Sequence, residues 1–346
     1  MVDLVTRKSL YFSGDGTIDV RDESLPDPKP HEVVVETLFS GISAGTESLI
    51  FHGNVPRDMS VDPSLKAYSG EFRYPLKYGY SLVGTIVETG AEVPKTFRDT
   101  RVFAFHPHES HFTAAMNDLI QLPETLSSED AVFLANMETA VNFLMDGQPL
   151  IGECVGVFGQ GVVGLLTTAL LNKFPLDPVI TTDFSPLRRQ LSTDFGADYT
   201  LDPSGSNIVD EIRSVLRTTG STSDFDLVYE LSGSPEALND AIAVAGYEGR
   251  IVIGSWYGNK PAHLDLGGSF HRSKIKLVSS QVSHIQSGFS GRWTKTRRLA
   301  VALDMLNDIR PSTLITHRFP VNRAQEAFNL LASAAQDIVQ VVITYE

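Results

Sequence analysis

Hydrophobic positions follow two different patterns along the chain, and the change between them divides the sequence. Up to about residue 149, short apolar runs such as 32–41 (EVVVETLFSG) and 81–90 (SLVGTIVETG) are separated by glycine and proline turns. This pattern is typical of a small β barrel. From residue 150 to 282, short apolar strands alternate with helical stretches. Such alternation predicts a parallel, doubly wound sheet of the α/β class.

The middle segment contains several runs that predict buried strands, because they are short, apolar and bounded by turn residues. These runs are residues 155–158, 178–183, 226–231, 249–255 and 274–282. Helices are predicted between them: one runs from Pro186 to Phe195 and is stopped by Gly196, and another is capped by Ser234. The last run is expected to be the edge strand of the sheet.

The chain returns to its first part after residue 282. About sixty residues remain there, which is too few for a convincing separate core. We therefore expect them to fold back onto the N-terminal segment. The sequence predicts two domains, one made of residues 1–149 and 283–346 and one of residues 150–282, since 346 residues exceed what a single core usually holds.

A glycine motif stands at the first strand-to-helix turn of the middle segment. Residues 159–164 spell GxGxxG between an apolar strand and a helix, the context that a dinucleotide fingerprint requires. Gly159 would permit the tight turn, Gly161 the approach of a pyrophosphate, and Gly164 close packing of helix and strand. The residues predicted to bind the cofactor here are Gly159, Gln160, Gly161, Val162, Val163 and Gly164.

The next strand ends on Asp183, nineteen residues after Gly164. A carboxylate at this place accepts hydrogen bonds from the adenosine ribose hydroxyls and repels a 2′-phosphate, which favours NAD over NADP. Arg188 and Arg189 complicate this prediction because they lie close enough on the following helix to reach a phosphate. A capping or turn role is the structural alternative for Asp183, although Ser185 already supplies a cap.

The amino-acid composition argues against several classes of binding partner and against cysteine cross-links. The formal net charge of −14 argues against nucleic acid and anionic membranes, because both are bound through basic patches. The chain has one cysteine, Cys154, so neither an intrachain disulfide nor a cysteine-rich zinc lobe is expected. The N-terminus lacks the order of a signal peptide, and the longest apolar run is interrupted by glycines. We expect a cytoplasmic protein that acts on a small molecule.

The two-part organisation resembles the medium-chain dehydrogenase/reductase superfamily, the zinc-type alcohol dehydrogenase-like proteins, over essentially the whole chain. The resemblance is carried by the glycine motif, by GRIVIGSWYG at 249–258 and by the tail ITHRFPVNRAQEAFNLLAS at 315–333. SGISAGTE at 40–47 and the pair Gly79 and Tyr80 are similar to bacteriochlorophyllide a dehydrogenase and its relatives. The resemblance implies a GroES-like β-rich catalytic domain, an inserted Rossmann domain, and a homodimer formed through the Rossmann edge strand.

The resemblance also locates the positions at which zinc enzymes of the superfamily carry their metal ligands. They fall on Ser43, Tyr80, Ser81 and a position at or near Ala135. Zinc needs thiolate, imidazole or carboxylate donors, so we expect no zinc and no metal site here. His106, His108 and His111 lie close together in FHPHESH, and a strand would point the first two to one face. A metal site there is one interpretation, and loop or cleft histidines are the other.

Without zinc, a hydrogen-bond donor must polarise the substrate carbonyl. Tyr80 is the first candidate because it occupies a ligand position and a phenol can donate and relay protons; the alternative is an aromatic side chain that fills the vacated space. Ser43 is a weaker donor. Thr46 and Glu47 lie where zinc enzymes place a relay hydroxyl and an acidic neighbour, although Glu47 could equally form a structural ion pair.

Three further residues complete the predicted site. His52 follows at a plausible relay distance, although a lone histidine is more often structural. The resemblance places Thr139 beside the nicotinamide, and a hydroxyl at a helix start is its structural alternative. Trp256 and Tyr257 follow a sheet strand at its C-terminal end, where they would border the nicotinamide or pack beneath a loop.

The leading hypothesis is a zinc-independent, NAD-dependent oxidoreductase that transfers a hydride between nicotinamide and an alcohol or carbonyl substrate. An NADPH-dependent quinone or enone reductase is the second hypothesis, and Asp183 counts against it. A nucleotide-binding protein without turnover is the third. The sequence does not identify the substrate, although the similarity to the bacteriochlorophyllide enzyme suggests a large hydroxyethyl-bearing molecule.

Overall fold

A computed structural model describes residues 6–56, 72–205, 207–220, 223–333 and 336–345. The chain forms two compact units, the first comprising residues 1–135 and 306–346 and the second residues 136–305. We call them the barrel unit and the Rossmann unit. None of the helices in the described part of the chain combines the length and apolar character needed to cross a bilayer.

The Rossmann unit is built on a six-stranded sheet with the order β11-β10-β9-β12-β13-β14, in which all neighbours are parallel. Its strands are β9 (Val155–Phe158), β10 (Val179–Thr182), β11 (Tyr199–Leu201), β12 (Phe225–Glu230), β13 (Ala245–Ile253) and β14 (Lys276–Ser279). Its helices are α3 (Leu134–Gly147), α4 (Val162–Leu171), α5 (Pro186–Asp194), α6 (Ile208–Thr218), α7 (Pro235–Val244), α8 (Ser269–Arg272) and α9 (Lys295–Ile309). The predicted doubly wound sheet is confirmed.

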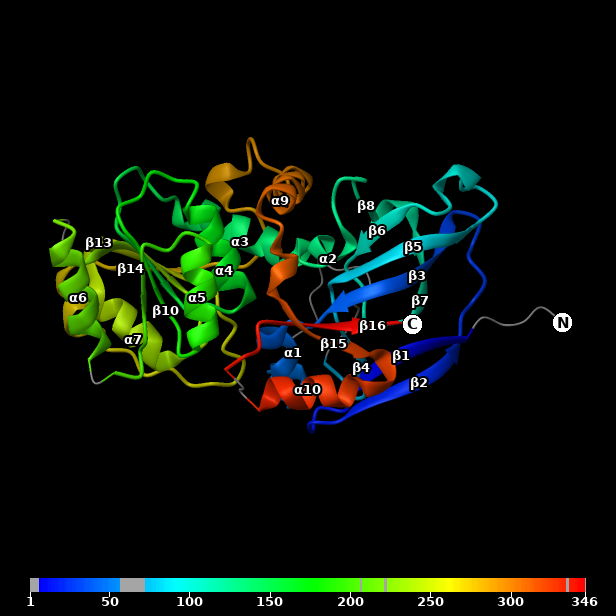
Figure 1. Cartoon of the computed structure of the whole chain (residues 1–346), viewed down its shortest axis with the longest axis horizontal. Coiled ribbons are helices and arrows are strands. Elements are labelled where there is room, and N and C mark those ends of the chain that lie inside the picture. The colour runs from blue at the N-terminus through cyan, green and yellow to red at the C-terminus, as the bar shows by residue number, and fades with distance from the viewer. Residues whose placement is uncertain (1–5, 57–71, 206, 221–222, 334–335, 346) are drawn as a thin grey trace. The chain divides into compact units, whose positions relative to one another are not determined.

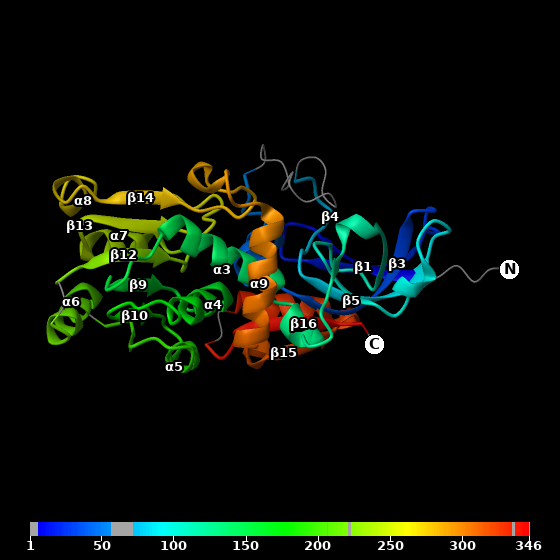
Figure 2. The ribbon, with the colours of Figure 1, turned by 90° about the horizontal axis from the view of Figure 1, so that it is seen from above.

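Helices cover both faces of this sheet (Figures 1 and 2). Buried side chains of α6 and α7 pack on one face, and side chains of α3 and α4 pack on the other. Strands β9 and β10 are buried along their whole length for this reason, since neither has a solvent-facing side. Each fully buried Ile or Leu contributes about 1.5–3 kcal/mol relative to an exposed one.

The barrel unit contains two sheets. One has the order β2-β1-β4, and the other has the order β15-β16-β3-β5-β6-β8, with β7 paired to β3. The strands are β1 (Thr6–Phe12), β2 (Ile18–Ser24), β3 (Glu32–Gly41), β4 (Leu76–Lys77), β5 (Leu82–Thr89), β6 (Arg101–Ala104), β7 (His111–Ala115), β8 (Ile120–Gln121), β15 (Ile315–Pro320) and β16 (Gln340–Thr344). The helices are α1 (Ala44–Phe51), α2 (Ser128–Ala131) and α10 (Ala324–Ala332).

The C-terminal tail returns to the barrel unit, as predicted. Strand β16 pairs antiparallel with β3, so that Val342 lies opposite Gly41. The β16 side chains Val341, Val342 and Ile343 are buried. The tail thus completes the sheet that the N-terminal segment begins.

The boundaries of the compact units fall inside helices α3 and α9, whereas the sequence placed them at residues 149 and 283. A buried ion pair explains why most of both helices belongs to the Rossmann unit. Arg298 of α9 is only 1% exposed and its Nη2 lies 3.0 Å from Glu138 Oε1 of α3. A second bond joins Arg298 Nη1 to Asn142 Oδ1 at 2.5 Å. Separating the helices would leave these charges buried without partners.

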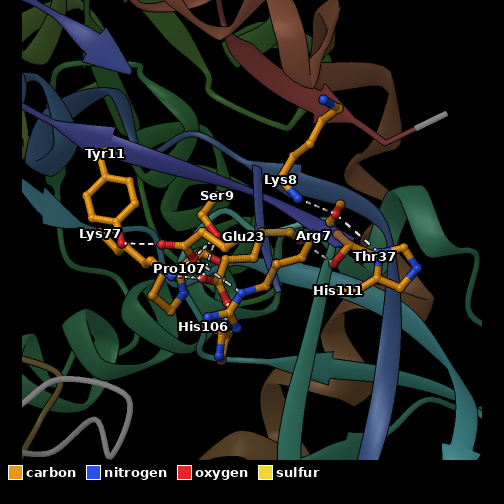
Figure 3. A network of polar contacts seen from close by, with 12 residues as sticks. Arg7, Lys8, Ser9, Tyr11, Glu23, Thr37, Lys77, His106, Pro107 and His111 are labelled. Atoms are coloured by element: carbon orange, nitrogen blue, oxygen red, sulfur yellow. Dashed lines mark hydrogen bonds and ion pairs between the residues drawn. The ribbon is translucent and has the colours of Figure 1, made fainter. Parts of the chain in front are cut away.

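A charge network joins β1, β2 and β4 to the loop before β7 (Figure 3). Its centres are two carboxylates, the half-buried Glu23 and Glu109, which is 2% exposed. The donors to them are Arg7, Ser9, Tyr11 and Lys77. Burial by itself raises the pKa of Glu23, but the hydrogen bonds, that from Lys77 foremost, outweigh it and lower this pKa to about 2.

Glu23→Gln should destabilise the protein by about 2 kcal/mol at neutral pH. The folded pKa of Glu23 lies below its ordinary 4.5, so its contribution is present above that pH and is lost as the pH falls toward 2. Chemical denaturation at pH 7 and pH 3 measures this: the difference from the parent protein should shrink at the lower pH. Asp22→Asn, at an exposed pair with Lys8, is the control. An equal difference at both pH values would contradict the assignment.

Candidate active site

The glycine turn of the Rossmann unit connects β9 to α4. Gly159 has φ +92°, and a Cβ there would lie 2.7 Å from Ser232 Cα, so that glycine is required. A Cβ on Gly164 would lie 2.0 Å from the Gly159 carbonyl oxygen, which confirms a packing role. A Cβ on Gly161 would meet nothing within 4 Å. Gly161 is also the N-cap of α4 and supplies no side-chain cap, so its open side is where an anion could approach the helix start.

The other residues of the motif divide between core and turn. Gln160 is fully buried, and its side chain donates to the carbonyls of Val157 and Gly159 while accepting from Thr168. Gln160 therefore supports the turn with its side chain, and only its backbone belongs to the edge of the site. Val162 and Val163 are half-buried in the first turn of α4.

Asp183 follows β10 and is 9% exposed. Its Oδ2 accepts from the backbone N–H of Gln160 at 2.7 Å, and its Oδ1 accepts from that of Ser185 at 2.8 Å. Each oxygen keeps a further lone pair, so the carboxylate is held in place and still has accepting capacity. Arg188 Nη1 lies 3.8 Å from Oδ2. Arg189 is engaged elsewhere, since it donates to the Asp183 carbonyl and pairs with Asp202.

Three hydroxyl groups meet in the barrel unit at the positions singled out in the sequence. The Tyr80 hydroxyl donates to Ser43 Oγ and lies 3.5 Å from Thr46 Oγ1. Ser43 is the N-cap of α1 and Thr46 belongs to its first turn, while Tyr80 lies two residues before β5. We call Ser43, Thr46 and Tyr80 the hydroxyl cluster. All three side chains are half-buried.

The phenol of Tyr80 is held in its protonated form. Burial, with a smaller contribution from the Glu47 charge, raises the pKa of Tyr80 to about 12, although the hydrogen bonds that Tyr80 makes with Ser43 and Thr46 oppose the shift. At neutral pH this side chain is therefore a hydrogen-bond donor and a reserve of one proton. That is the chemistry a developing alkoxide requires.

Glu47 and His52 lie apart from the hydroxyls. The Glu47 carboxylate is fully buried; it accepts from the Ser43 backbone N–H at 2.9 Å and lies 2.8 Å from His108 Nε2. His52 is exposed and forms the C-cap of α1, at the opposite end of the helix from Ser43. Glu47 is therefore joined to the backbone of Ser43, a member of the hydroxyl cluster. His52 lies at the other end of α1 and does not join the cluster.

Thr139 lies in the Rossmann unit. It is half-buried in the second turn of α3, which begins at Leu134. Tyr257 donates its hydroxyl to Glu230 Oε2 at 2.8 Å, and the same carboxylate accepts from the backbone of Ser232. Tyr257 is therefore anchored to the end of β12. Its neighbour Trp256 is half-buried in the same loop.

The donor set at the zinc-ligand positions does not fit zinc. Ser43 and Tyr80 hydrogen-bond to each other, Ser81 Oγ donates to the Val132 carbonyl, and Ala135 has no donor atom. Within the described ranges, no three His, Cys, Asp or Glu side chains are grouped so that they could hold a metal ion.

The three histidines near residue 108 have separate partners. His106 stacks on Phe112, His111 lies 3.9 Å from Glu36, and His108 is buried between Glu47 and Ser40. Residues 105–110 form a loop rather than the strand that would have aligned His106 with His108. Burial lowers the pKa of His106 to about 4, so this imidazole is neutral at physiological pH.

Sequence reasoning missed the partners of His108. They lie 61 and 68 residues away, at Glu47 and Ser40. No local spacing links such positions. The only available signal was that a buried glutamate and a histidine in one domain need partners.

Comparisons with known proteins find similarity to dehydrogenases. The zinc-binding dehydrogenase family matches residues 162–300. L-threonine 3-dehydrogenase of Sinorhizobium medicae (strain WSM419) is 26% identical over 339 residues, which cover 89% of this chain and 90% of that protein.

Two solved structures share the fold over almost the full length. A short chain alcohol dehydrogenase of Escherichia coli CFT073, solved with NADH, has a TM-score of 0.77 at 19% identity, covering 98% of this chain and 99% of that one. A protein described as a zinc-binding dehydrogenase, from Sinorhizobium meliloti 1021 and solved with NADP, has a TM-score of 0.78 at 19% identity over the same shares.

Two glycine variants should separate folding from ligand binding at the turn. Gly161→Ala should leave thermal unfolding nearly unchanged, because its Cβ enters open space, yet weaken binding of NADH at least tenfold if a pyrophosphate approaches there. Gly164→Ala should impair folding itself, because its Cβ meets a carbonyl. Differential scanning calorimetry and a fluorescence titration with NADH measure the two effects. Undiminished binding by Gly161→Ala would remove the turn from the cofactor site.

Proposed function

Because the chain belongs to the medium-chain dehydrogenase/reductase superfamily and is an alcohol-dehydrogenase-like oxidoreductase, we propose that it works with NAD(H) and without zinc. The substrate of the proposed reaction is a small-molecule alcohol or carbonyl compound. The observation that carries the proposal is the hydroxyl cluster of Tyr80, Ser43 and Thr46, of which Tyr80 and Ser43 stand at the positions where the resemblance places zinc ligands.

The preference for NAD is inferred from Asp183. Two backbone N–H groups hold its carboxylate in place and leave lone pairs for a ribose diol. The same negative charge opposes a 2′-phosphate. Arg188 is the opposing feature, because it lies near the carboxylate and bears a positive charge. The two related structures were solved with NADH and NADP respectively, so the choice rests on this pair of side chains.

When bound, the nicotinamide supplies or accepts the hydride. In the direction of reduction, the Tyr80 O–H donates to the substrate carbonyl oxygen and transfers its proton as the alkoxide forms. Ser43 and Thr46, which flank the phenol, stabilise the phenolate left behind, and solvent returns the proton. The balance is carbonyl, NADH and one proton giving alcohol and NAD⁺. In oxidation the steps run in reverse: Tyr80 first releases its proton to solvent, and the phenolate then takes the proton of the alcohol as the hydride is transferred to NAD⁺.

Two finer expectations belong to the same proposal. The motif similarity to the bacteriochlorophyllide enzyme still suggests a large hydroxyethyl-bearing substrate, although related folds accept many substrates. We further propose a cytoplasmic homodimer formed through β14, the last strand in the sheet order, because an edge strand of this kind favours pairing with a second copy. Sedimentation as a monomer would contradict the dimer.

Asp183→Asn should weaken NADH binding about tenfold or more, because it removes a charged hydrogen-bond acceptor. NADPH binding should fall less or improve, since the repulsion of its phosphate is also removed. Isothermal titration with both cofactors measures the ratio. Asp202→Asn, an exposed position that pairs with Arg189, is the matched control. Equal losses for the two cofactors, or tighter NADPH than NADH binding by the parent protein, would favour the NADPH-dependent alternative.

Tyr80→Phe should lower kcat/KM about 10²–10³-fold, as expected for the loss of one donor to a developing oxyanion. NADH affinity should stay within twofold of that of the parent protein. Steady-state assays with the substrate that a panel of alcohols and ketones identifies measure the first quantity. Tyr74→Phe is the control, because this phenol donates to the Ile50 carbonyl and lies outside the cluster.

Metal analysis completes the test of the proposal. Elemental analysis of the active protein should find far less than one zinc per chain, and a chelator should leave the activity unchanged. Stoichiometric zinc, or unchanged turnover by Tyr80→Phe, would overturn the zinc-independent mechanism. NADH binding without turnover of any carbonyl in the panel would support a non-catalytic nucleotide-binding protein.

A further inference from the structure

His108 is a fully buried side chain that the proposed reaction does not use. Both of its ring nitrogens are engaged: Nε2 lies 2.8 Å from Glu47 Oε2, and Nδ1 lies 2.6 Å from Ser40 Oγ. Ser40 Oγ in turn lies 2.7 Å from the hydroxyl of Tyr345. The edge of Phe328 packs against the imidazole ring. The ring cannot turn without losing a bond to Glu47 or Ser40.

His108 contacts the two separate segments that carry the hydroxyl cluster. On one side it pairs with Glu47, whose other oxygen accepts from the Ser43 backbone N–H. On the other side its ring lies against Gly79, where an added Cβ would come within 2.7 Å of the ring carbon Cδ2. Its backbone N–H also donates to the Tyr78 carbonyl at 3.1 Å. One residue therefore spans from the first turn of α1 to the segment that presents Tyr80.

We propose that His108 is a positioning residue that sets the distance between Ser43 and Tyr80. The imidazole, clamped between Glu47 and Ser40, holds the start of α1 and the Gly79–Tyr80 segment at the separation at which the two hydroxyls meet. Its catalytic consequence rests on the proposed function, in which Tyr80 is the proton donor.

The hydrogen-bond chain suits orientation rather than proton transfer. It runs from Tyr345 through Ser40 and His108 to Glu47, and it ends at the backbone N–H of Ser43. A backbone amide does not release a proton under these conditions. The titratable groups that face the imidazole are Glu47 of α1 and, through Ser40, Tyr345 after β16. These hydrogen bonds thus connect α1, β3 and the residue that follows β16 without delivering a proton to the hydroxyl cluster.

Gly79 supports the same interpretation. It has φ +127°, a backbone region that L side chains rarely adopt, and the His108 ring occupies the space that a side chain would need. A glycine at this position, directly before Tyr80, lets the imidazole approach the backbone closely. The close approach and the two ring hydrogen bonds together determine where Tyr80 lies.

The test compares His108→Leu with His108→Gln, in which the amide can still donate to Glu47. Tyrosine labelled with ¹³C at Cζ reports the titration of Tyr80, whose signal is identified by its loss in Tyr80→Phe. In the parent protein Tyr80 should titrate near 12. His108→Leu should raise the pKa of Tyr80 further, because separating the phenol from Ser43 removes a hydrogen bond that lowers this pKa, whereas His108→Gln should largely retain the parent value. This readout needs no substrate.

Kinetics form the second arm. His108→Leu should lower kcat at least tenfold with NADH affinity unchanged, and His108→Gln should recover most of the loss. Added to Tyr80→Phe, His108→Leu should cost less than threefold, because no donor remains to be positioned. Ser40→Ala, which removes one side of the clamp and leaves the Glu47 pair, supplies a second variant with a smaller effect in the same direction, should His108→Leu fail to fold.

The outcomes separate the two proposals. A folded His108→Leu protein whose Tyr80 titration and kcat match those of the parent would overturn the positioning role, as would full additivity with Tyr80→Phe. If Tyr80→Phe retains full turnover, the proposed function fails, and a Tyr80 titration that still shifts in His108→Leu supports the positioning role on its own.

Discussion

Burial of carboxylate side chains is the constraint on which the rest of this structure depends. A carboxylate removed from water is strongly unfavourable unless several donors surround it. In the described part of the chain, Glu47, Glu109, Asp183 and Glu230 are among the carboxylates that are less than a tenth exposed. Each receives at least two donors, and the donors come from different segments of the chain. The conformations of the turns around them follow from this requirement.

In the Rossmann unit, two buried carboxylates fix the loops at the carboxyl end of the parallel sheet. Asp183 joins the end of β10 to the glycine turn through the Gln160 backbone N–H, and Glu230 joins the end of β12 to the loop that carries Tyr257. Both carboxylates stand at the C-terminal ends of parallel strands, where open sheets of this type bind ligands. A group that organises a turn in this way is also oriented before a ligand arrives, which reduces the entropy lost on binding.

In the proposed mechanism, a buried carboxylate takes over part of what a metal ion does. Zinc would orient its ligands and polarise a carbonyl at once. The proposal divides the two tasks: Glu47 and His108, which contact each other, orient, and the Tyr80 phenol, which contacts Ser43, donates. A phenol adds no positive charge, so the proposed reaction depends on proton transfer and on the alignment of the donor rather than on Lewis acidity. Small displacements of Tyr80 are therefore expected to matter more than they would beside a metal ion.

The predicted fold was confirmed because its signals are local. Apolar runs bounded by turn residues correspond to β9, β10, β12, β13 and β14, and the run at residues 32–41 coincides with β3. The glycine motif is also a local signal in the sequence, although the atoms that exclude a side chain at Gly159 belong to Ser232, in the loop after β12. The sequence did not predict that α3 and α9 would belong largely to the Rossmann unit, because that depends on the pair between Arg298 and Glu138, 160 residues apart.

The sequence alone determined the alternation of strands and helices, the dinucleotide turn, and the absence of suitable zinc ligands at Ser43, Tyr80 and Ser81. Only the tertiary structure decided that Glu47 pairs with His108, that Tyr80 meets Ser43, and that His52 lies at the far end of α1. The physical reason is the separation along the sequence over which each effect acts. Periodicity and turn chemistry act between neighbours in the chain, whereas a buried charge is satisfied by whichever donor the folded chain brings within about 3 Å.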